Sequence, residues 1–133
     1  MRALKTITQP INEAVIVRPE VSFMQAMKAL GKIIISLPGC TRYIHPEEIL
    51  YIKAESNYSE IYLVQGQKFL LSKTLKEIEA ELPSHIFFRI HRGYCVNISH
   101  VTHLNKNIEG WTLLLTNKEE VPVSRDKKSL FAY

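Results

Sequence analysis

The spacing of apolar residues changes at Gly31, which divides the chain into a short first part and a longer second part. Residues 22–30, SFMQAMKAL, have the pattern of an amphipathic helix that Ser22 can cap and Gly31 can end. Its apolar side chains recur at helical spacing, with one more beside them: Phe23, Met27, Leu30 and Met24. Ahead of this helix, the stretch AVIV at 14–17 predicts a short strand that Pro19 closes.

From Lys32 onward the pattern predicts mostly short strands. Apolar runs bounded by turn residues favour strands over 33–37, 49–55, 57–64, 68–71, 87–90, 101–104, 111–115 and 120–123. The dipeptide at 38–39, Pro-Gly, marks a turn after the first of them. The dipeptide at 65–66, Gln-Gly, joins 57–64 to 68–71 as a hairpin.

Two later segments have helical patterns. Residues 74–82 begin with a capping box, in which Thr74 and Glu77 each satisfy the other's free backbone N–H. The apolar stripe of this helix is formed by Leu75, Ile78 and Leu82. Residues 124–133 also have a helical pattern, with Ser124 as the cap. We therefore expect a mainly β fold with one capped central helix and a short C-terminal helix.

Composition places the chain among ordinary soluble proteins. It has 133 residues, of which 46% are hydrophobic and 23% charged, enough for one domain or one domain with an extension. No apolar run approaches the about 20 residues that a membrane helix needs, and the first ten residues lack a signal-peptide core. We expect a cytoplasmic protein with no membrane contact, in which Cys40 and Cys95 stay reduced.

The basic charge is unevenly distributed. The net charge of +4 is too small by itself to identify a nucleic-acid-binding protein. Residues 33–85, however, carry five Lys/Arg against seven Asp/Glu, whereas residues 86–133 carry seven against four. The basic excess therefore lies in the last third of the chain, as expected for a one-sided electrostatic footprint.

The stretch FFRIHRGYCVNISHV at 87–101 places basic and imidazole groups inside an apolar run. A strand would put Arg89 and His91 on one face, and Gly93 would allow the backbone to turn away after it. Clustered basic groups such as Arg92 on that loop suit an anionic partner, for example nucleic acid. The alternative is that Arg89 pairs with an acidic residue and His91 forms hydrogen bonds inside the fold.

The C-terminal segment offers a second candidate. If Ser124 caps a helix, Arg125 lies in the first turn beside unpaired backbone N–H groups, where anions are favoured. Its guanidinium suits phosphate or guanine edges, and Lys128 would lie one turn further on. The alternative is that this is simply a solvated basic face.

The segment ESNYSE at 55–60 offers a third candidate. Asn57 and Tyr58 fall between two predicted strands, where polar side chains on a tight loop can reach a partner. The alternative is that Asn57 is only the turn residue and that Tyr58 begins the next strand.

Metal binding and catalysis have little support in the sequence. The candidate ligands have spacings of four, five and three, which match no strong zinc pattern: His91, Cys95, His100 and His103. There is also no phosphate-binding glycine loop and no nucleophile-elbow motif. We expect no enzymatic activity, no metal and no cofactor.

The order of the segments resembles a known family. The motifs are I-x-Y-I-x-A-x-x-N-Y at 49–58, T-L-K-E-I at 74–78, F-x-R-I-H-R-x-Y-x-V-N at 87–97 and P-V-S-R at 122–125. Together they resemble the LytTR DNA-binding domain, the output domain of LytR/AlgR/AgrA-type bacterial transcription regulators. The similarity covers residues 32–133 and leaves 1–31 as an N-terminal extension.

The resemblance implies a fold of several small packed β-sheets and a function in sequence-specific binding of double-stranded promoter DNA. Family members insert side chains from successive loops into adjacent major grooves and commonly bind as two copies on repeated sites. The positions that match their contact loops are Asn57, Tyr58, Ser59, His91, Arg92, Ser124, Arg125 and Lys128. We expect base-edge contacts from Arg92 and Arg125. To the other motif residues we assign strand packing, loop anchoring and turn capping: Arg89, Tyr94 and Asn97.

Two features depart from the family pattern. Gly93 occupies a position where the family usually has serine. Residues 1–31 are also too few for the receiver domain that family regulators often carry, so we expect the chain to lack one. The helix at 22–30 could instead mediate a homodimer, bind a regulator or sensor protein, or cover a sheet edge. The rival to DNA binding is an interaction module that titrates a regulatory partner through this helix.

Overall fold

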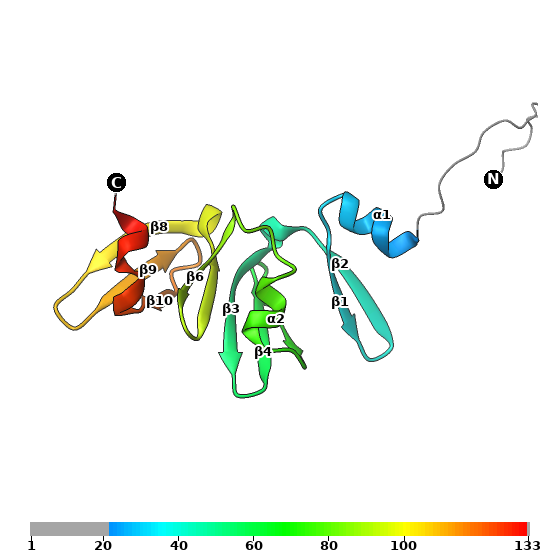
Figure 1. Cartoon of the computed structure of the whole chain (residues 1–133), viewed down its shortest axis with the longest axis horizontal. Coiled ribbons are helices and arrows are strands. Elements are labelled where there is room, and N and C mark those ends of the chain that lie inside the picture. Colours follow the sequence, from blue (N-terminus) through cyan, green and yellow to red (C-terminus); the bar gives the residue numbers. More distant parts are fainter. Residues whose placement is uncertain (1–21, 133) are drawn as a thin grey trace, which may run out of the picture.

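The computed structural model describes residues 22–132, whose strands form three antiparallel sheets that stand side by side in an elongated row (Figure 1). A two-stranded sheet pairs β1 (Ile33–Leu37) with β2 (Cys40–Ile44). A five-stranded sheet has the order β5-β4-β3-β7-β6, and a three-stranded sheet has the order β10-β9-β8. The prediction of a mainly β fold is confirmed. The predicted strand at 14–17 lies outside the described residues.

Most strands lie where the apolar pattern predicts them. The remaining strands are β3 (Ile49–Glu55), β4 (Tyr58–Leu63), β5 (Lys68–Leu71), β6 (Phe87–His91), β7 (Tyr94–Asn97), β8 (Val101–Lys106), β9 (Trp111–Leu115) and β10 (Glu120–Val123). The helices are α1 (Phe23–Ala29), α2 (Leu75–Glu79) and the 3-10 helices η2 (Pro46–Glu48), η3 (Ile98–His100) and η4 (Arg125–Phe131). The sequence did not predict β2 or β7, and α2 is shorter than the expected 74–82.

Side-chain capping fixes where both α-helices begin. The Ser22 hydroxyl accepts from the Gln25 amide at 3.0 Å, and the Gln25 side chain accepts from the Ser22 amide at 3.0 Å. In α2, the Thr74 hydroxyl accepts from the Glu77 amide at 3.2 Å and the Glu77 carboxylate accepts from the Thr74 amide at 2.8 Å. After α1, Gly31 takes a left-handed φ of 86°, which only glycine adopts without strain. Both predicted caps are therefore present.

Two hydrophobic cores hold the row of sheets together. The first lies among the five-stranded sheet, α2 and the β1–β2 hairpin, and it includes Ile35, Ile52, Ile61, Leu75 and Ile78. The second joins the five-stranded sheet to the three-stranded sheet, and it includes Leu50, Ile90, Val96, Leu113 and Val121. Because neighbouring sheets share these cores, the hairpins that contribute side chains to them are held in fixed positions relative to one another.

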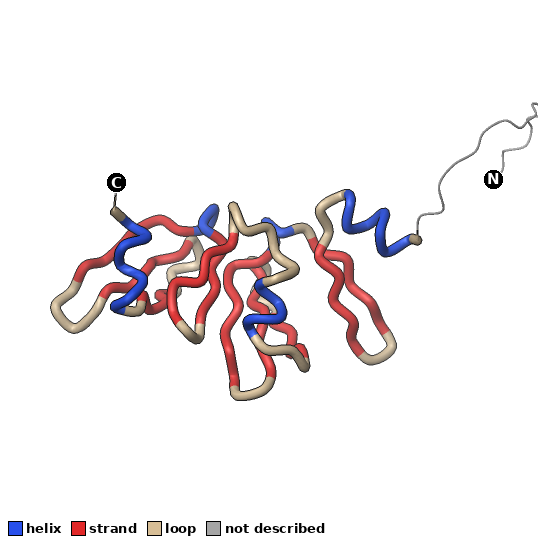
Figure 2. The backbone as a smooth tube through the Cα atoms, viewed as in Figure 1, coloured by secondary structure: helices blue, strands red, loops and turns tan. Residues whose placement is uncertain are grey.

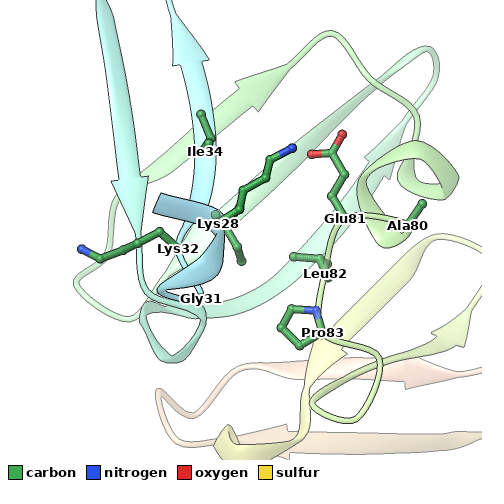
Figure 3. A pocket seen from close by; sticks show the side chains of 9 residues that line it. Lys28, Gly31, Lys32, Ile34, Ala80, Glu81, Leu82 and Pro83 are labelled. Carbon is green, nitrogen blue, oxygen red and sulfur yellow. The ribbon is translucent and has the colours of Figure 1, made fainter. Parts of the chain in front are cut away.

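Helix α1 lies at the margin of this arrangement. None of its residues is buried, and Phe23 meets the Tyr43 ring in an edge-to-face contact, with 5.6 Å between the ring centroids. A cavity of about 420 Å³ separates the end of α1 from the end of α2, with Lys28 and Glu81 extending into it from opposite sides (Figure 3). The helix predicted at 22–30 therefore forms, but its apolar face remains largely exposed.

The turns of three hairpins point the same way. The β1–β2, β3–β4 and β6–β7 turns, drawn as tan loops, all lie along the lower edge of the molecule in Figure 2. Helix η4 starts near the same edge and runs upward to the C-terminus. The three candidate segments from the sequence therefore lie on one side of the row.

Candidate nucleic-acid interface

Backbone hydrogen bonds join the three candidate segments. The amide of Ala54, just before the β3–β4 turn, donates to the carbonyl of Gly93 in the β6–β7 turn at 2.8 Å. The amide of Ser124, where β10 ends, donates to the carbonyl of Ile90 in β6 at 2.9 Å. The β6–β7 hairpin is thus the middle member of three linked loops.

The β3–β4 turn exposes two of its three candidate residues. Ser56 has a left-handed φ of 55°, a strained backbone conformation of the kind often found at functional sites. Asn57 and Tyr58 are exposed beside it. Ser59, in contrast, is fully buried, and its hydroxyl donates to the carbonyl of Lys73 at 2.9 Å. This burial argues against the expected DNA contact by Ser59, whose side chain instead fixes the hairpin to the segment before α2.

Arg89 supports the β6–β7 loop from within. Its Nη1 lies 2.9 Å from Glu79 Oε1, which neutralises its charge. Its Nε donates to the carbonyl of His91 at 3.0 Å, and its Nη2 donates to the carbonyl of Arg92. Arg89 thus pairs with an acidic residue, as the alternative interpretation of the sequence proposed. Its guanidinium also holds the backbone of the two loop residues in place.

His91 and Arg92 present different groups at this loop. The His91 Nδ1 accepts from the amide of Gly93 at 2.9 Å, so the neutral ring carries its proton on Nε2, the nitrogen left for a partner. Arg92 is exposed. The backbone turns at 92–93 as expected, but Gly93 does not have a left-handed φ, so the turn does not require glycine at this position.

Serine at position 93 should therefore be tolerated. A Cβ built on Gly93 would meet His91 Nδ1 at 3.5 Å, an ordinary van der Waals contact. We expect Gly93→Ser to raise the free energy of unfolding by about 0.4–1 kcal/mol, because it restricts the unfolded chain without straining the folded one. Urea denaturation would measure the change.

The matched control is Gly39→Ser in the β1–β2 turn. Gly39 has a left-handed φ of 74°, so serine there should lower stability by roughly 1 kcal/mol. Equal destabilisation by both substitutions would contradict the assignment of Gly93.

The start of η4 differs from the expected capped α-helix. The segment is a 3-10 helix of seven residues, and Ser124 at its start makes no side-chain capping hydrogen bond. The Ser124 hydroxyl lies 3.3 Å from the carbonyl of Ile90 and 2.8 Å from the carboxylate of Asp126. Its contacts are thus internal, and it holds exposed Arg125 beside the β6–β7 hairpin.

Lys128 lies on an aromatic ring. Its Nζ is 4.6 Å from the centroid of the Trp111 ring, and Lys106 Nζ is 5.1 Å from the same centroid. Neither Trp111 nor Lys106 was among the candidates predicted from the sequence. The predicted strand at 101–104 stopped before Lys106, whereas the observed β8 extends to it and pairs it with Trp111 of β9.

The remaining motif residues are internal. Asn97 is fully buried: its Nδ2 donates to the carbonyls of Pro46 and Ile49 at 3.1 and 2.9 Å. Its Oδ1 accepts from the Ser99 amide at 2.9 Å, which is the turn cap expected from the sequence. Tyr94 is half-buried and packs against the second core.

Some of the positively charged side chains are neutralised by a nearby carboxylate, and others are not. Within residues 22–132, the cations that lie within salt-bridge distance of a carboxylate are Lys53, Lys68, Lys73 and Arg89. Arg92, Arg125 and Lys128 make no such pair in that part of the chain. Other described cations, Lys106 and Lys118 among them, also make no such pair. Arg92, Arg125 and Lys128 differ in lying on the linked segments, where an unneutralised cation retains its full charge for an anionic ligand.

Ionisable groups inside the sheets stabilise the fold. Burial, followed by a hydrogen bond of 2.7 Å to Glu60, raises the pKa of Tyr62 to about 12. The same hydrogen bond is the main cause of the lowered pKa of Glu60, whose stabilising effect is lost as the pH falls through that lowered value. Burial raises the pKa of the Cys95 thiol to about 12, so it packs as a neutral, apolar group.

Among the residues that the structure describes, no group of three His, Cys, Asp or Glu side chains could hold a metal ion. No helix in the same part of the chain is long and apolar enough to cross a membrane.

Comparisons with known proteins agree with the fold. The family model described as the LytTr DNA-binding domain matches residues 39–132. The structure is also similar to a LytTr DNA-binding domain from Bacillus cereus, with a TM-score of 0.66 and 22% identity over 76% of this chain and 93% of that one. At this identity the structural likeness establishes the fold.

Several transcription regulators are similar in sequence. The chain is 34% identical over 87 residues to an uncharacterized response regulatory protein of Vibrio cholerae, covering 63% of this chain and 33% of that protein. It is 32% identical over 90 residues to the transcriptional regulatory protein YpdB of Escherichia coli K12 (63% and 35%). It is 29% identical over 98 residues to the CO-responsive transcriptional regulator RcoM of Rhodospirillum rubrum (72% and 41%). The matched region is thus 33% to 41% of the length of these relatives.

Proposed function

The chain belongs to the LytTr DNA-binding domain family, and on that basis we propose that it is a sequence-specific transcription regulator that reads promoter DNA through three linked loops. The proposal includes no enzymatic activity. It assigns residues 32–133 to the DNA-binding domain and 1–31 to an extension.

One observation carries the proposal: Arg92, Arg125 and Lys128 are not neutralised by any described carboxylate and lie on loops tied together by backbone hydrogen bonds. Keeping several like charges unpaired on one edge is unfavourable unless an anion binds there. DNA supplies closely spaced negative charges along a fixed path. Arg89, two strand positions from His91, differs from these three cations because Glu79 neutralises its charge.

The side chains on these linked segments suggest different roles. Arg92 and Arg125 carry the planar fork that suits guanine edges, whereas the ammonium of Lys128 suits phosphate. His91 can donate from Nε2 to a phosphate or base. Asn57 and Tyr58 would contact DNA at the next groove along. The buried hydroxyl of Ser59 and the internally bonded hydroxyl of Ser124 are left as supports for these loops.

Binding as two copies on repeated sites is part of the proposal. Helix α1 supplies a candidate contact between copies, or with a regulator or sensor protein, because Phe23 and Leu30 are 65% and 69% exposed. The same exposed face favours the rival function, an interaction module that titrates a partner without binding DNA. The rival does not explain the unpaired cations at the opposite side of the fold.

Selection from a random pool of duplexes with the purified chain tests the function. We expect a repeated motif to be enriched by the wild type and lost by the Arg92→Ala/Arg125→Ala variant, with both proteins equally folded by circular dichroism. The spacing of the repeat would give the arrangement of two copies. No enrichment by folded wild-type protein would reject the proposal and favour the interaction module.

A further inference from the structure

We propose that Lys106 is a further phosphate-binding residue and that Trp111 positions it together with Lys128, forming a clamp beside Arg125. This inference rests on the proposed function and adds a fourth contact to its three loops.

Strand register places these residues in one row. Lys106 at the end of β8 pairs with Trp111 at the start of β9, which pairs with Val123 at the end of β10. Neighbouring strands are about 4.8 Å apart, so the Lys106 backbone lies roughly 10 Å from Val123. Arg125 follows two residues later. Lys106 therefore lies at the same end of the three-stranded sheet as the proposed base-reading arginine.

The indole holds both lysines without neutralising them. The two ammonium groups lie within about 5 Å of one ring, the range of a cation–π interaction, at 5.1 Å for Lys106 and 4.6 Å for Lys128. Phe131 meets Trp111 edge-on, with 6.3 Å between the ring centroids, and fixes the indole in turn. Within residues 22–132, no carboxylate lies within salt-bridge distance of either lysine.

A third lysine, Lys68, also lies over an aromatic ring, but it is neutralised by a carboxylate. Lys68 Nζ lies 5.5 Å from the Tyr62 ring centroid, but it also lies 3.2 Å from Glu60 Oε2. Its charge is therefore satisfied internally. Lys106 and Lys128 repel each other across a shared ring, and a bound phosphate would relieve that repulsion. Phosphate binding thus accounts for two unpaired ammonium groups on one indole.

A salt series tests the clamp. Affinity of the purified chain for the selected duplex and for a random duplex would be measured by fluorescence anisotropy of labelled DNA at several salt concentrations. We expect Lys106→Gln to weaken binding to both duplexes alike and to reduce the slope of log affinity against log salt by about 0.9, the value for one lost phosphate contact.

Lys118→Gln is the matched control, because it removes the same charge from the β9–β10 turn at the other end of β9. Its slope should equal that of the wild type. Trp111→Leu keeps both lysines, so a reduced slope in a folded variant would establish positioning. A lowered melting temperature with an unchanged slope would reduce Trp111 to a packing residue and overturn its assigned role.

The two proposals fail differently. Wild-type protein that binds neither duplex would reject the DNA-binding function itself. Wild-type protein that binds DNA, together with a Lys106→Gln variant of unchanged slope, would reject the clamp and leave the three loops in place.

Discussion

Replacing Arg125 by alanine should weaken binding to the selected duplex by about 5- to 150-fold, which corresponds to the 1–3 kcal/mol of a bidentate contact between arginine and a base edge. Binding to a random duplex should weaken much less, because phosphate contacts elsewhere are unaffected. The structural reason is that Arg125 is exposed and unpaired among the described residues, while Ser124 fixes its backbone to the carbonyl of Ile90. Competition titrations of both duplexes would measure the change in discrimination.

Arg125→Lys separates charge from shape at this position. Lysine keeps the positive charge but lacks the planar fork, so binding to random DNA should persist while discrimination is lost. Full discrimination by the lysine variant would assign Arg125 to a phosphate and would leave Arg92 as the remaining candidate for base readout. Lys118→Gln again provides the control for a general loss of charge.

Replacing Asn97 by alanine should lower the free energy of unfolding by about 2–4 kcal/mol, because it leaves buried hydrogen-bonding groups without partners. The carbonyls of Pro46 and Ile49 would lose their donor, and the amide of Ser99 would lose its acceptor. Urea denaturation of the wild type and the variant would measure the difference.

Two further variants sharpen this test. Asn97→Asp keeps the acceptor for Ser99 but places a carboxylate against two carbonyl oxygens, so at neutral pH it should destabilise at least as much as alanine. Asn107→Ala in the exposed β8–β9 turn should change stability by less than about 0.5 kcal/mol. A small effect at position 97, similar to that at 107, would show that the buried amide is not what joins η2, β3 and β7.

Local sequence signals predicted the elements that depend on them. The capping boxes at Ser22 and Thr74 are contained within four residues each, and both helices begin there. The apolar run over residues 49–55 likewise gave β3 with its correct bounds. Fold class and these element starts therefore follow from short-range patterns.

The strands that the sequence missed lack such a pattern. In β2, only Ile44 is fully buried, because this hairpin strand has no second layer over most of its length. In β7, the residues from Cys95 to Asn97 are all buried, so no polar position alternates with the apolar ones. Both strands are recognised only through their partners, β1 in one case and β3 and β6 in the other.

In the candidate site, too, some features follow from the local sequence and others depend on distant parts of the chain. Residue types and spacing indicated which segments to propose as the interface, but the direction of individual side chains depends on contacts made far along the chain. Ser59 turns inward to the carbonyl of Lys73, and Ser124 bonds across to Ile90. The Lys106–Trp111–Lys128 cluster likewise combines two strands and a helix.

The hydrogen bonds from Ala54 to Gly93 and from Ser124 to Ile90 keep the distances between the three proposed DNA-binding loops constant. Loops fixed at constant intervals cannot shift independently when the bases beneath them move by one step of about 3.4 Å. Any mismatch in spacing must then be absorbed by the duplex, at an elastic cost that depends on its sequence. The operator would therefore be chosen partly for how readily it bends, including at base pairs that no side chain touches.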